Sequence, residues 1–459
     1  MGSDEKRIEI LRSDPKQSVL RMAVPIMVTM IFTSLYNVVD GIWIAGLGEH
    51  AIAGIGIVTP LWMVITALSN GLSHGATSAI SRYAATDKAK AERASEHAVM
   101  VYLAAGAALT IVLLAVLKPY INYYAVSAQT AQEAMAYSLP LFGGLISVTL
   151  SFGIAAIMRA EGDTKRPMYA MTLGVVLNGL LDPVFIYTLG WGAAGAAVST
   201  VFTSFISAAI MAWWITKRKS YFCVKMKGIF SRHYDKTIIK DILTTGIPAS
   251  FELLMMSIAS FCFYSIIRNL GDDYGVSVYS SGYRLYLIAL MPVTAISLAA
   301  VPIIGMHFGG KNIEWVRRAH WFCTHYALGC AAVTTLIMVV FAHHFASLFA
   351  LTNDDTKFID GIADFIRVTS FCIPFLAIGL PSTFMYLGLG KGRMSLMWTT
   401  INEVVCAVPA TYLLGVVMGY GLPGVWLGFV VGRGLASTCN YIFSRRYINH
   451  LGINIQKHE

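Results

Sequence analysis

Long apolar runs follow one another along the chain and are separated by short polar segments. Several of these runs exceed 18 residues, which is the signal of a helix that crosses a bilayer. Some are longer than a minimal span needs, which predicts tilted helices or ends that protrude from the membrane. We predict twelve spans, at 19–47, 52–81, 95–117, 131–158, 167–189, 193–216, 244–268, 276–306, 319–345, 360–387, 395–417 and 423–444.

The composition agrees with this pattern. Of the 459 residues 56% are hydrophobic and 13% are charged, and the mean hydropathy is +0.64. A soluble protein carries about 25% charged residues. The expected fold class is therefore an all-α polytopic membrane protein, which excludes a soluble or structural role. Residues 1–21 are of mixed charge and have no apolar core, so we expect no cleaved signal peptide.

The basic residues predict the orientation of the chain in a cell membrane. Alternate polar segments hold most of the Lys and Arg, and the segments between them hold little more than Lys118, Arg268 and Lys357. Because basic loops stay in the cytoplasm, both termini are predicted to be cytoplasmic. The net charge of +9 is thus explained by topology, and we expect no nucleic-acid partner.

The chain also shows an internal repeat. A polar segment after the sixth span divides it into an N-terminal lobe (1–216), a basic linker (217–243) and a C-terminal lobe (244–459). Pro25 aligns with Pro248, and Leu47-Gly48-Glu49 aligns with Leu270-Gly271-Asp272. Six spans per half give a parallel repeat, so we predict two pseudo-symmetric six-helix bundles around a cavity. This is a design of alternating-access transporters.

Two aspartates lie inside apolar runs of the first half. Placing a carboxylate such as Asp40 or Asp182 in the middle of a span costs about 2.5–3.5 kcal/mol, and an ionisable residue there indicates a functional site. Asp40 aligns with Phe263 in the second half, so the duplication does not explain the acidic residues.

Helix directions place several oxygen-bearing side chains at one depth. At ~1.5 Å per residue, Asp40 lies roughly 10 Å below the outer end of its helix, and Asp182 and Thr200 roughly 12 Å below theirs. Asn178 precedes Asp182 by one turn on the same face. These four residues predict a site for Na⁺ or for a proton shared by coupled carboxylates. Alternatively, each aspartate only caps a broken helix or bonds a neighbour, which Pro183 makes plausible for Asp182.

Two further polar residues accompany these oxygens on the same helix face or at the same depth. Asn37 lies three residues before Asp40, and Tyr137 reaches the same level from the fourth span. The second half has charges of its own inside the spans. Glu403 or Glu252 together with Arg433 forms either a structural network or a second binding site, and Arg284 lies mid-span nearby.

Several motifs together make the chain resemble the MATE (multidrug and toxic compound extrusion) family, and in particular its archaeal and DinF-like branch. The motifs are Pro25, Leu35-Tyr36-Asn37-x-x-Asp40-Gly41-Ile42-Trp43, Arg159-Ala160-Glu161-Gly162-Asp163, Leu177-Asn178 through Leu181-Asp182-Pro183, and Gly195-Ala196-Ala197-x-x-Thr200. The resemblance covers essentially the whole chain. It departs at Ala155, where related archaeal members carry Asn, so the polarity of the cavity differs there.

The resemblance implies a V-shaped, two-lobe antiporter that expels amphipathic, often cationic, small molecules in exchange for inward Na⁺ or H⁺. The cation site would consist of the residues that match the family motif: Asp40, Asn178, Asp182 and Thr200. Pro25 would bend the first helix as that site changes occupancy, and Tyr36, Asn37 and Tyr137 would line the substrate cavity. No organic cofactor is implied, and we expect a monomer in the lipid bilayer.

Two other functions compete with this prediction. A lipid-linked saccharide flippase of the same superfamily would need a basic cavity for a pyrophosphate, and Arg284 and Arg433 favour it. An intramembrane aspartyl protease would use Asp40 and Asp182, but the Tyr-Asp and Gly-x-Gly-Asp contexts of such enzymes are absent. We therefore expect a transporter and not an enzyme.

Overall fold

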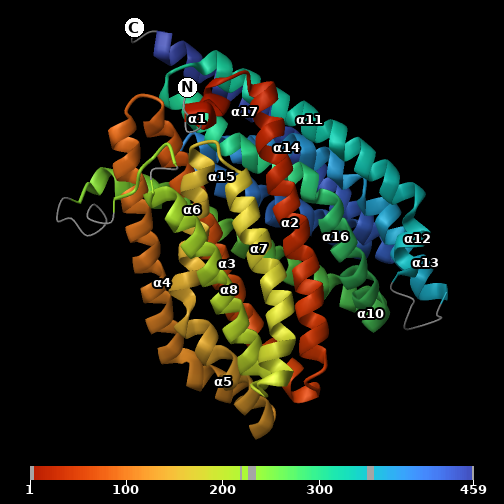
Figure 1. The fold of residues 1–459 in the computed structure, drawn as a ribbon. Helices are drawn as coiled ribbons and strands as arrows, with labels where there is room; N and C mark the ends of the chain where they lie inside the picture. The colour runs from red at the N-terminus through yellow and green to blue at the C-terminus, as the bar shows by residue number, and fades with distance from the viewer. Residues whose placement is uncertain (1–4, 218–219, 226–233, 349–355, 457–459) are drawn as a thin grey trace. The chain divides into compact units, whose positions relative to one another are not determined.

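The computed structural model describes residues 5–217, 220–225, 234–348 and 356–456, and within these ranges it contains helices and no strand (Figure 1). The first half comprises α1 (Glu5–Arg12), α2 (Pro15–Ala45), α3 (Glu49–Ala84), α4 (Lys88–Tyr124), α5 (Ala128–Gly143), α6 (Leu145–Ala160), α7 (Lys165–Pro183), the π-helix η1 (Val184–Thr188) and α8 (Gly192–Thr216). The second half comprises α10 (Lys236–Gly309), α11 (Ile313–Val340), α12 (Ala342–Ser347), α13 (Thr356–Thr369), α14 (Cys372–Gly388), α15 (Gly392–Thr400), the π-helix η3 (Ile401–Ala407), α16 (Val408–Tyr412), the π-helix η4 (Leu413–Val417) and α17 (Gly421–Gln456).

The all-α membrane fold predicted from the sequence is confirmed. In the described part of the chain, eight helical segments are long and apolar enough to cross a membrane, or ten if each of two bent pairs counts as one span. One of the eight, α10, has a non-helical backbone at Asp272 (φ 47°, ψ −147°), in the loop predicted between 244–268 and 276–306. The apolar set does not include α17, which covers the predicted last span. The total of twelve spans stays a prediction.

Both bent pairs have a proline near the break. α5 and α6 meet at 47°, and Pro140 lies one turn before Gly144, where the two helices join. α13 and α14 also meet at 47°, and Pro374 has no N–H to donate to the carbonyl of Ser370. The Ile373 N–H at 3.0 Å and the Thr335 hydroxyl at 3.1 Å donate to that carbonyl instead. Inside a bilayer such a side-chain donor is what allows a helix to bend there.

The chain forms two compact units, which we call the first unit (Met1–Arg12 and Val28–Ser250) and the second unit (Ser13–Met27 and Phe251–Glu459). These units differ from the predicted lobes, because residues 13–27 were predicted in the N-terminal lobe and belong to the second unit. In the first unit α3 packs on α4, α5 and α6, and α8 packs on α5, α6 and α7. Small residues permit this close packing, as in other membrane helices. At Gly153, for example, a Cβ would lie 2.5 Å from the Tyr102 ring.

In the second unit α17 is the central helix, because it packs on α14, η3, α16, η4 and α11. Glycines on α17 make the approach to η3 and α16 very close. A Cβ at Gly432 would lie 2.5 Å from the carbonyl oxygen of Cys406, and one at Gly428 would lie 2.5 Å from the Cα of Thr411. The position of α17 therefore depends on the absence of side chains there.

The predicted basic linker, 217–243, is partly structured. Residues 218–219 and 226–233 lie outside the described residues, and α10 already begins at Lys236. The Asp235 carboxylate accepts the Thr237 N–H at 2.9 Å, so Asp235 caps the helix. The sequence predicts a linker here because the stretch holds many basic residues. A single capping aspartate is too weak a signal to predict that the helix begins at this point.

The described linker residues 220–225 are held by a buried carboxylate. Glu161 accepts the Ser220 hydroxyl at 2.6 Å and the Tyr221 N–H at 2.8 Å, and it pairs with Arg166 at 2.9 Å. Burial raises the pKa of the Glu161 carboxyl to about 7, although the Ser220 bond and the Arg166 charge act in the opposite direction. The side chain of Phe222 is fully buried, so this segment is part of the first unit's core.

Candidate functional site

The outer half of α2 carries the first candidate residue, Asp40, which is half-buried. Two contacts hold this part of α2 against other helices of the first unit. One turn before Asp40, the Tyr36 hydroxyl lies 3.3 Å from the Thr200 hydroxyl on α8. Beyond Asp40, the Tyr187 hydroxyl of η1 donates to the carbonyl of Trp43 at 2.6 Å. The segment of α2 that carries Asp40 is thus held by a hydrogen bond on each side of it.

The second carboxylate lies near the end of α7. Asn178 and Asp182 are both buried, with exposed fractions of 2% and 0%, and their spacing of one turn places them on one face. Asn178 donates from Nδ2 to the Ser199 hydroxyl of α8 at 2.8 Å. Pro183 follows Asp182, and the backbone continues as the π-helix η1. π-Helical turns within helices are frequent at functional sites.

These side chains converge on one place within the first unit. Asp40 and Asp182 lie close enough to interact electrostatically, and Tyr36 and Tyr137 each lie close enough to interact with both carboxylates. Ser199 is a further polar neighbour of Asp182. The depth count predicted from the sequence placed Tyr137 at this level, and the structure brings it there.

The site contains buried oxygen atoms without hydrogen-bond donors. Both carboxylate oxygens of Asp182 and the amide oxygen of Asn178 are buried with no hydrogen-bond partner among the described residues. In that part of the chain, neither Asp40 nor Asp182 forms an ion pair with Lys, Arg or His. Burying acceptor oxygens in this way is costly unless a proton or cation satisfies them. These oxygen atoms are therefore suited to bind a cation.

The chemistry of the oxygens limits which cation fits. Carboxylate, amide and hydroxyl oxygens are hard ligands, which suit Na⁺ or H⁺ better than a soft transition metal. Within the described residues, no group of three or more His, Cys, Asp or Glu side chains is placed to hold a metal ion. Thr200 donates its hydroxyl to the carbonyl of Ala196 at 3.1 Å, so only its lone pairs can face a ligand.

Two other predicted residues are not among the interacting members of this cluster. Asn37 is exposed, and no hydrogen bond joins its side chain to Asp40 or Asp182 within the described residues. Pro25 lies inside α2, in the segment Ser13–Met27 that belongs to the second unit. The bend that the resemblance assigns to Pro25 stays a prediction.

Of the four charged residues predicted in the second unit, two form an ion pair and two lie outside that pair. Glu403 in η3 accepts from Arg433 Nη2 of α17 at 2.5 Å, and both side chains are buried. Arg433 also donates from Nη1 to the Tyr286 hydroxyl at 3.2 Å and lies 3.8 Å over the Phe429 ring. Of the two carboxylates that the sequence offered as partners for Arg433, the structure selects Glu403.

Glu252 and Arg284 are placed elsewhere in the second unit. The Oε1 atom of Glu252 is buried without a hydrogen-bond partner among the described residues, beside Ser395 and Thr399. Arg284 is exposed on α10 and forms no ion pair with the described part of the chain. Among the described residues, no ion pair joins Glu252 or Arg284 to Glu403 or Arg433, and a common site for the four stays a prediction.

Two residues of these clusters were not predicted from the sequence. Ser199, which holds Asn178, is the residue before Thr200 and lies at nearly the same depth. Tyr286, which accepts from Arg433, is one of 22 tyrosines in an apolar chain. In the sequence, each of the two is only a polar residue within a predicted span, and nothing else marks it as part of a site.

Comparison with known proteins identifies the family. The model of the MatE family matches residues 25–184 and 248–413, which include Asp40, Asn178 and Asp182. The chain belongs to the MatE family. The probable multidrug resistance protein NorM of Thermotoga maritima is 23% identical over 93% of this chain and 92% of its own length.

Solved structures agree over nearly the whole chain. The outward-facing conformation of a multidrug resistance MATE family transporter of the MOP superfamily is 31% identical, with a TM-score of 0.92, and the match covers 97% of this chain and 98% of that one. A MOP superfamily transporter from Pyrococcus furiosus is 30% identical, with a TM-score of 0.90 and the same coverage. In that transporter, the reverse polarity of the binding pocket suggests a different function.

Proposed function

We propose that this MatE-family transporter is a secondary antiporter that exports amphipathic, often cationic, small molecules in exchange for inward Na⁺ or H⁺. The similarity to multidrug resistance proteins supports the class of substrate. The observation that carries the exchange mechanism is the set of buried, unpartnered oxygens of Asn178 and Asp182 beside Asp40, where neither carboxylate has a cationic partner in the described part of the chain. A multi-pass location in the cell membrane, with both termini in the cytoplasm, is part of the proposal.

The carboxylate pair accounts for exchange rather than one-way transport. Asp40 and Asp182 repel each other when both are ionised in apolar surroundings, so binding a cation or a proton relieves the repulsion. A cationic substrate and a coupling cation would compete for the same negative charge. Each could shift the transporter between its outward-open and inward-open states only by its difference in affinity for the two.

The contacts around α2 suggest how occupancy would be transmitted. Tyr36 lies one turn from Asp40 and contacts Thr200, so a change in charge at the pair acts directly on the packing of α2 against α8. Asn178, one turn before Asp182, donates to the Ser199 hydroxyl and so links α7 to α8 beside the pair. Neutralising the pair lowers the cost of burying it, which favours a tighter approach of α2.

The test is efflux of a fluorescent lipophilic cation from proteoliposomes under an imposed Na⁺ gradient or an imposed pH gradient. We expect wild-type efflux to follow one gradient, which identifies the coupling ion. We expect Asp40→Asn and Asp182→Asn each to abolish the gradient dependence. Asp364→Asn is the matched control, because this aspartate is 68% exposed and pairs with Arg367 at 3.1 Å.

The outcome that overturns the proposal is full, gradient-driven exchange by both Asp40→Asn and Asp182→Asn. If only Asp182→Asn kept its cation dependence, the paired site would be wrong while a role for Asp40 alone survived. Thermal unfolding of each variant in detergent shows whether a loss of efflux reflects misfolding.

The alternative of a saccharide flippase loses support from the second unit. A pyrophosphate would need free guanidinium groups, but the charge of Arg433 is matched by Glu403 at 2.5 Å. Arg284 is exposed and is not part of that ion pair. The flippase prediction would regain support if a lipid-linked pyrophosphate competed with the cationic dye in the same liposomes.

A further inference from the structure

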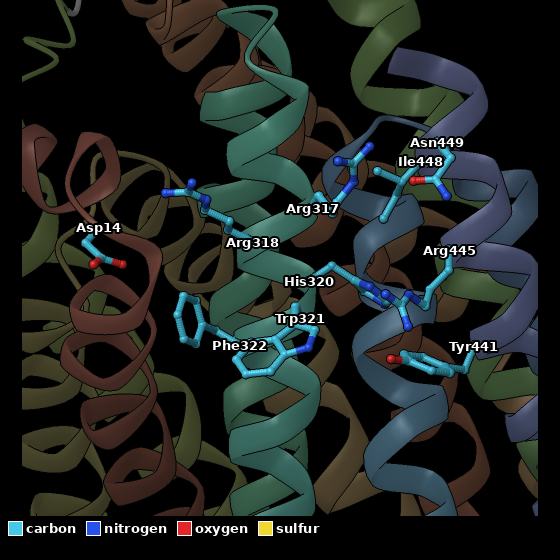
Figure 2. Close-up of a pocket in the computed structure, with 10 residues that line it drawn as sticks. All are labelled: Asp14, Arg317, Arg318, His320, Trp321, Phe322, Tyr441, Arg445, Ile448 and Asn449. Atoms are coloured by element: carbon cyan, nitrogen blue, oxygen red, sulfur yellow. The ribbon is translucent and has the colours of Figure 1, made fainter. Parts of the chain in front are cut away.

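A cavity of about 310 Å³ opens beside α11 and α17 in the second unit. Figure 2 shows Arg317 and Arg318 on α11 and Arg445 on α17, with the aromatic side chains of Trp321 and Tyr441 beside them. None of these residues belongs to the carboxylate site of the first unit. The volume is at the lower end of the range of about 300–1,000 Å³ that small-molecule sites occupy.

The cavity has a surplus of positive charge. Arg317 and Arg318 share one carboxylate, that of Glu314, at 2.9 and 3.3 Å, and both arginines are half-exposed. Arg445 forms no ion pair with any residue that the structure describes and lies 5.8 Å from the Tyr441 ring. Among the described residues, the only acidic one that lines the cavity is Asp14, which accepts the Lys16 N–H at 3.0 Å. Three guanidinium groups thus face two carboxylates, which leaves one positive charge unmatched.

The cavity lies where helices leave the membrane. Arg317 and Arg318 are in the second turn of α11, directly before the predicted span 319–345, and Arg445 directly follows the predicted span 423–444. Trp321 is 43% exposed and stacks on His325 with ring centroids 3.8 Å apart. Exposed Trp beside basic residues is typical of the boundary between headgroups and hydrocarbon. The positive-inside rule predicts that this boundary faces the cytoplasm.

Two rows of exposed side chains continue from the cavity towards the middle of the membrane. On α11 the row runs from Trp321 through Leu328 to Leu336, at spacings that keep one helix face. On α17 it runs from Ile442 to Leu435. Apart from the exposed His325, one turn after Trp321, both rows are apolar and would contact acyl chains, so the arginines lie above two lipid-facing strips.

We propose that this cavity binds the phosphate of an anionic phospholipid headgroup, with its acyl chains along the two apolar rows. Guanidinium groups match phosphate oxygens in geometry and charge, and basic pockets between helices on the cytoplasmic side are where such headgroups bind. The single unmatched charge favours a phosphodiester with one negative charge over a phosphomonoester with two. The apolar rows favour a lipid over a soluble phosphate.

The experiment measures binding of dioctanoyl phosphatidylglycerol to the full-length chain in detergent by native mass spectrometry. We expect saturable binding of one lipid, weakened by about fivefold for each arginine removed in Arg445→Gln and in Arg317→Gln/Arg318→Gln. Dioctanoyl phosphatidylcholine, which has no net charge, should bind more weakly. Asp14→Asn should tighten binding of phosphatidylglycerol, because it removes a repelling carboxylate and keeps an acceptor for the Lys16 N–H.

Arg446→Gln is the matched control, because Arg446 is an exposed neighbour of Arg445 that does not line the cavity. It should leave binding unchanged. Equal losses in Arg446→Gln and Arg445→Gln would overturn the proposal in favour of unspecific surface charge, and so would unchanged binding in the cavity variants. Displacement of the lipid by inorganic phosphate at the same concentration would overturn the lipid source, since the same arginines would then serve a soluble phosphate.

Discussion

The buried ion pair between Glu403 and Arg433 makes a sharp prediction about stability. In Glu403→Gln the side chain keeps its size but loses its charge, so the guanidinium of Arg433 stays buried without a counter-ion. Arg433 and Glu403 have exposed fractions of 3% and 6%, and their nearest atoms lie 2.5 Å apart. Water cannot replace the lost carboxylate at such a position.

The magnitude follows from the burial of both groups. Removing one partner of a buried pair costs about 3–5 kcal/mol, because the other charge is left uncompensated. The Tyr286 hydroxyl and the Phe429 ring contact Arg433 in the wild type and in the variant, so they do not offset the loss. The exposed pair of Asp364 and Arg367 has a similar separation, 3.1 Å, yet such a surface pair contributes about 0–1 kcal/mol.

Thermal unfolding in detergent, followed by tryptophan fluorescence, measures the difference. For a unit of this size, we expect Glu403→Gln to lower the melting temperature by roughly 6 °C or more. Asp364→Asn, the exposed control, should change it little. The double variant Glu403→Gln/Arg433→Met should recover most of the loss, because replacing a whole buried pair by an apolar group is often neutral. Equal shifts for Glu403→Gln and Asp364→Asn, or a double variant less stable than Glu403→Gln, would refute the reasoning.

Three further predictions concern single positions. Asp182→Asn should raise the melting temperature while it abolishes ion-driven efflux in liposomes, because it removes a buried charge that lacks a partner; a lower melting temperature would contradict the unpartnered state. For Glu161, whose pKa is raised from 4.5 to about 7, the folded protein binds the proton more tightly than the unfolded chain. Stability should therefore fall by about 3 kcal/mol as the pH rises from 4.5 to 7, and denaturant titrations should show this dependence lost in Glu161→Gln. Gly432→Ala should destabilise the protein by about 1–3 kcal/mol, since its Cβ would lie 2.5 Å from the carbonyl of Cys406. Gly329→Ala, where the Cβ meets nothing within 4 Å, should be neutral or slightly stabilising in the same thermal assay.

Counting residues along helices predicted which side chains lie together in the candidate site of the first unit. The depth of a residue in a span follows from its distance to the helix end, so Asp40, Asp182, Thr200 and Tyr137 could be assigned to one level. The structure brings these residues, together with Asn178, into one cluster. Depth was sufficient here because α2, α7 and α8 are close neighbours in the first unit.

Rotation about the helix axis was harder to predict than depth. Asn37 and Tyr36 lie three and four residues before Asp40, which turns them by about 60° and 40° to opposite sides of it. The sequence could not say which side faces the protein, and the structure shows that Tyr36 does. The choice of Glu403 over Glu252 as the partner of Arg433 depended on rotation in the same way.

Contacts between distant segments were beyond sequence reasoning. The stretch after α8 is polar and basic, which predicts a linker, yet Ser220 and Tyr221 bind the buried Glu161. Likewise, the cavity beside α11 combines residues of α11 and α17 with Asp14, which precedes α2. The sequence shows each arginine only as part of a basic segment that predicts topology.

Asp182 in the first unit and Glu403 in the second are buried carboxylates with opposite surroundings. In each unit the carboxylate lies at a π-helical segment of a corresponding span: Asp182 directly before Pro183 and η1, and Glu403 inside η3. The second unit supplies a permanent cation, Arg433, at hydrogen-bond distance. The first unit supplies none among its described residues and adds a second carboxylate, Asp40. A covalently attached guanidinium cannot be exchanged, so of these two carboxylate sites the pair in the first unit is the one that fits the proposed uptake and release of a cation.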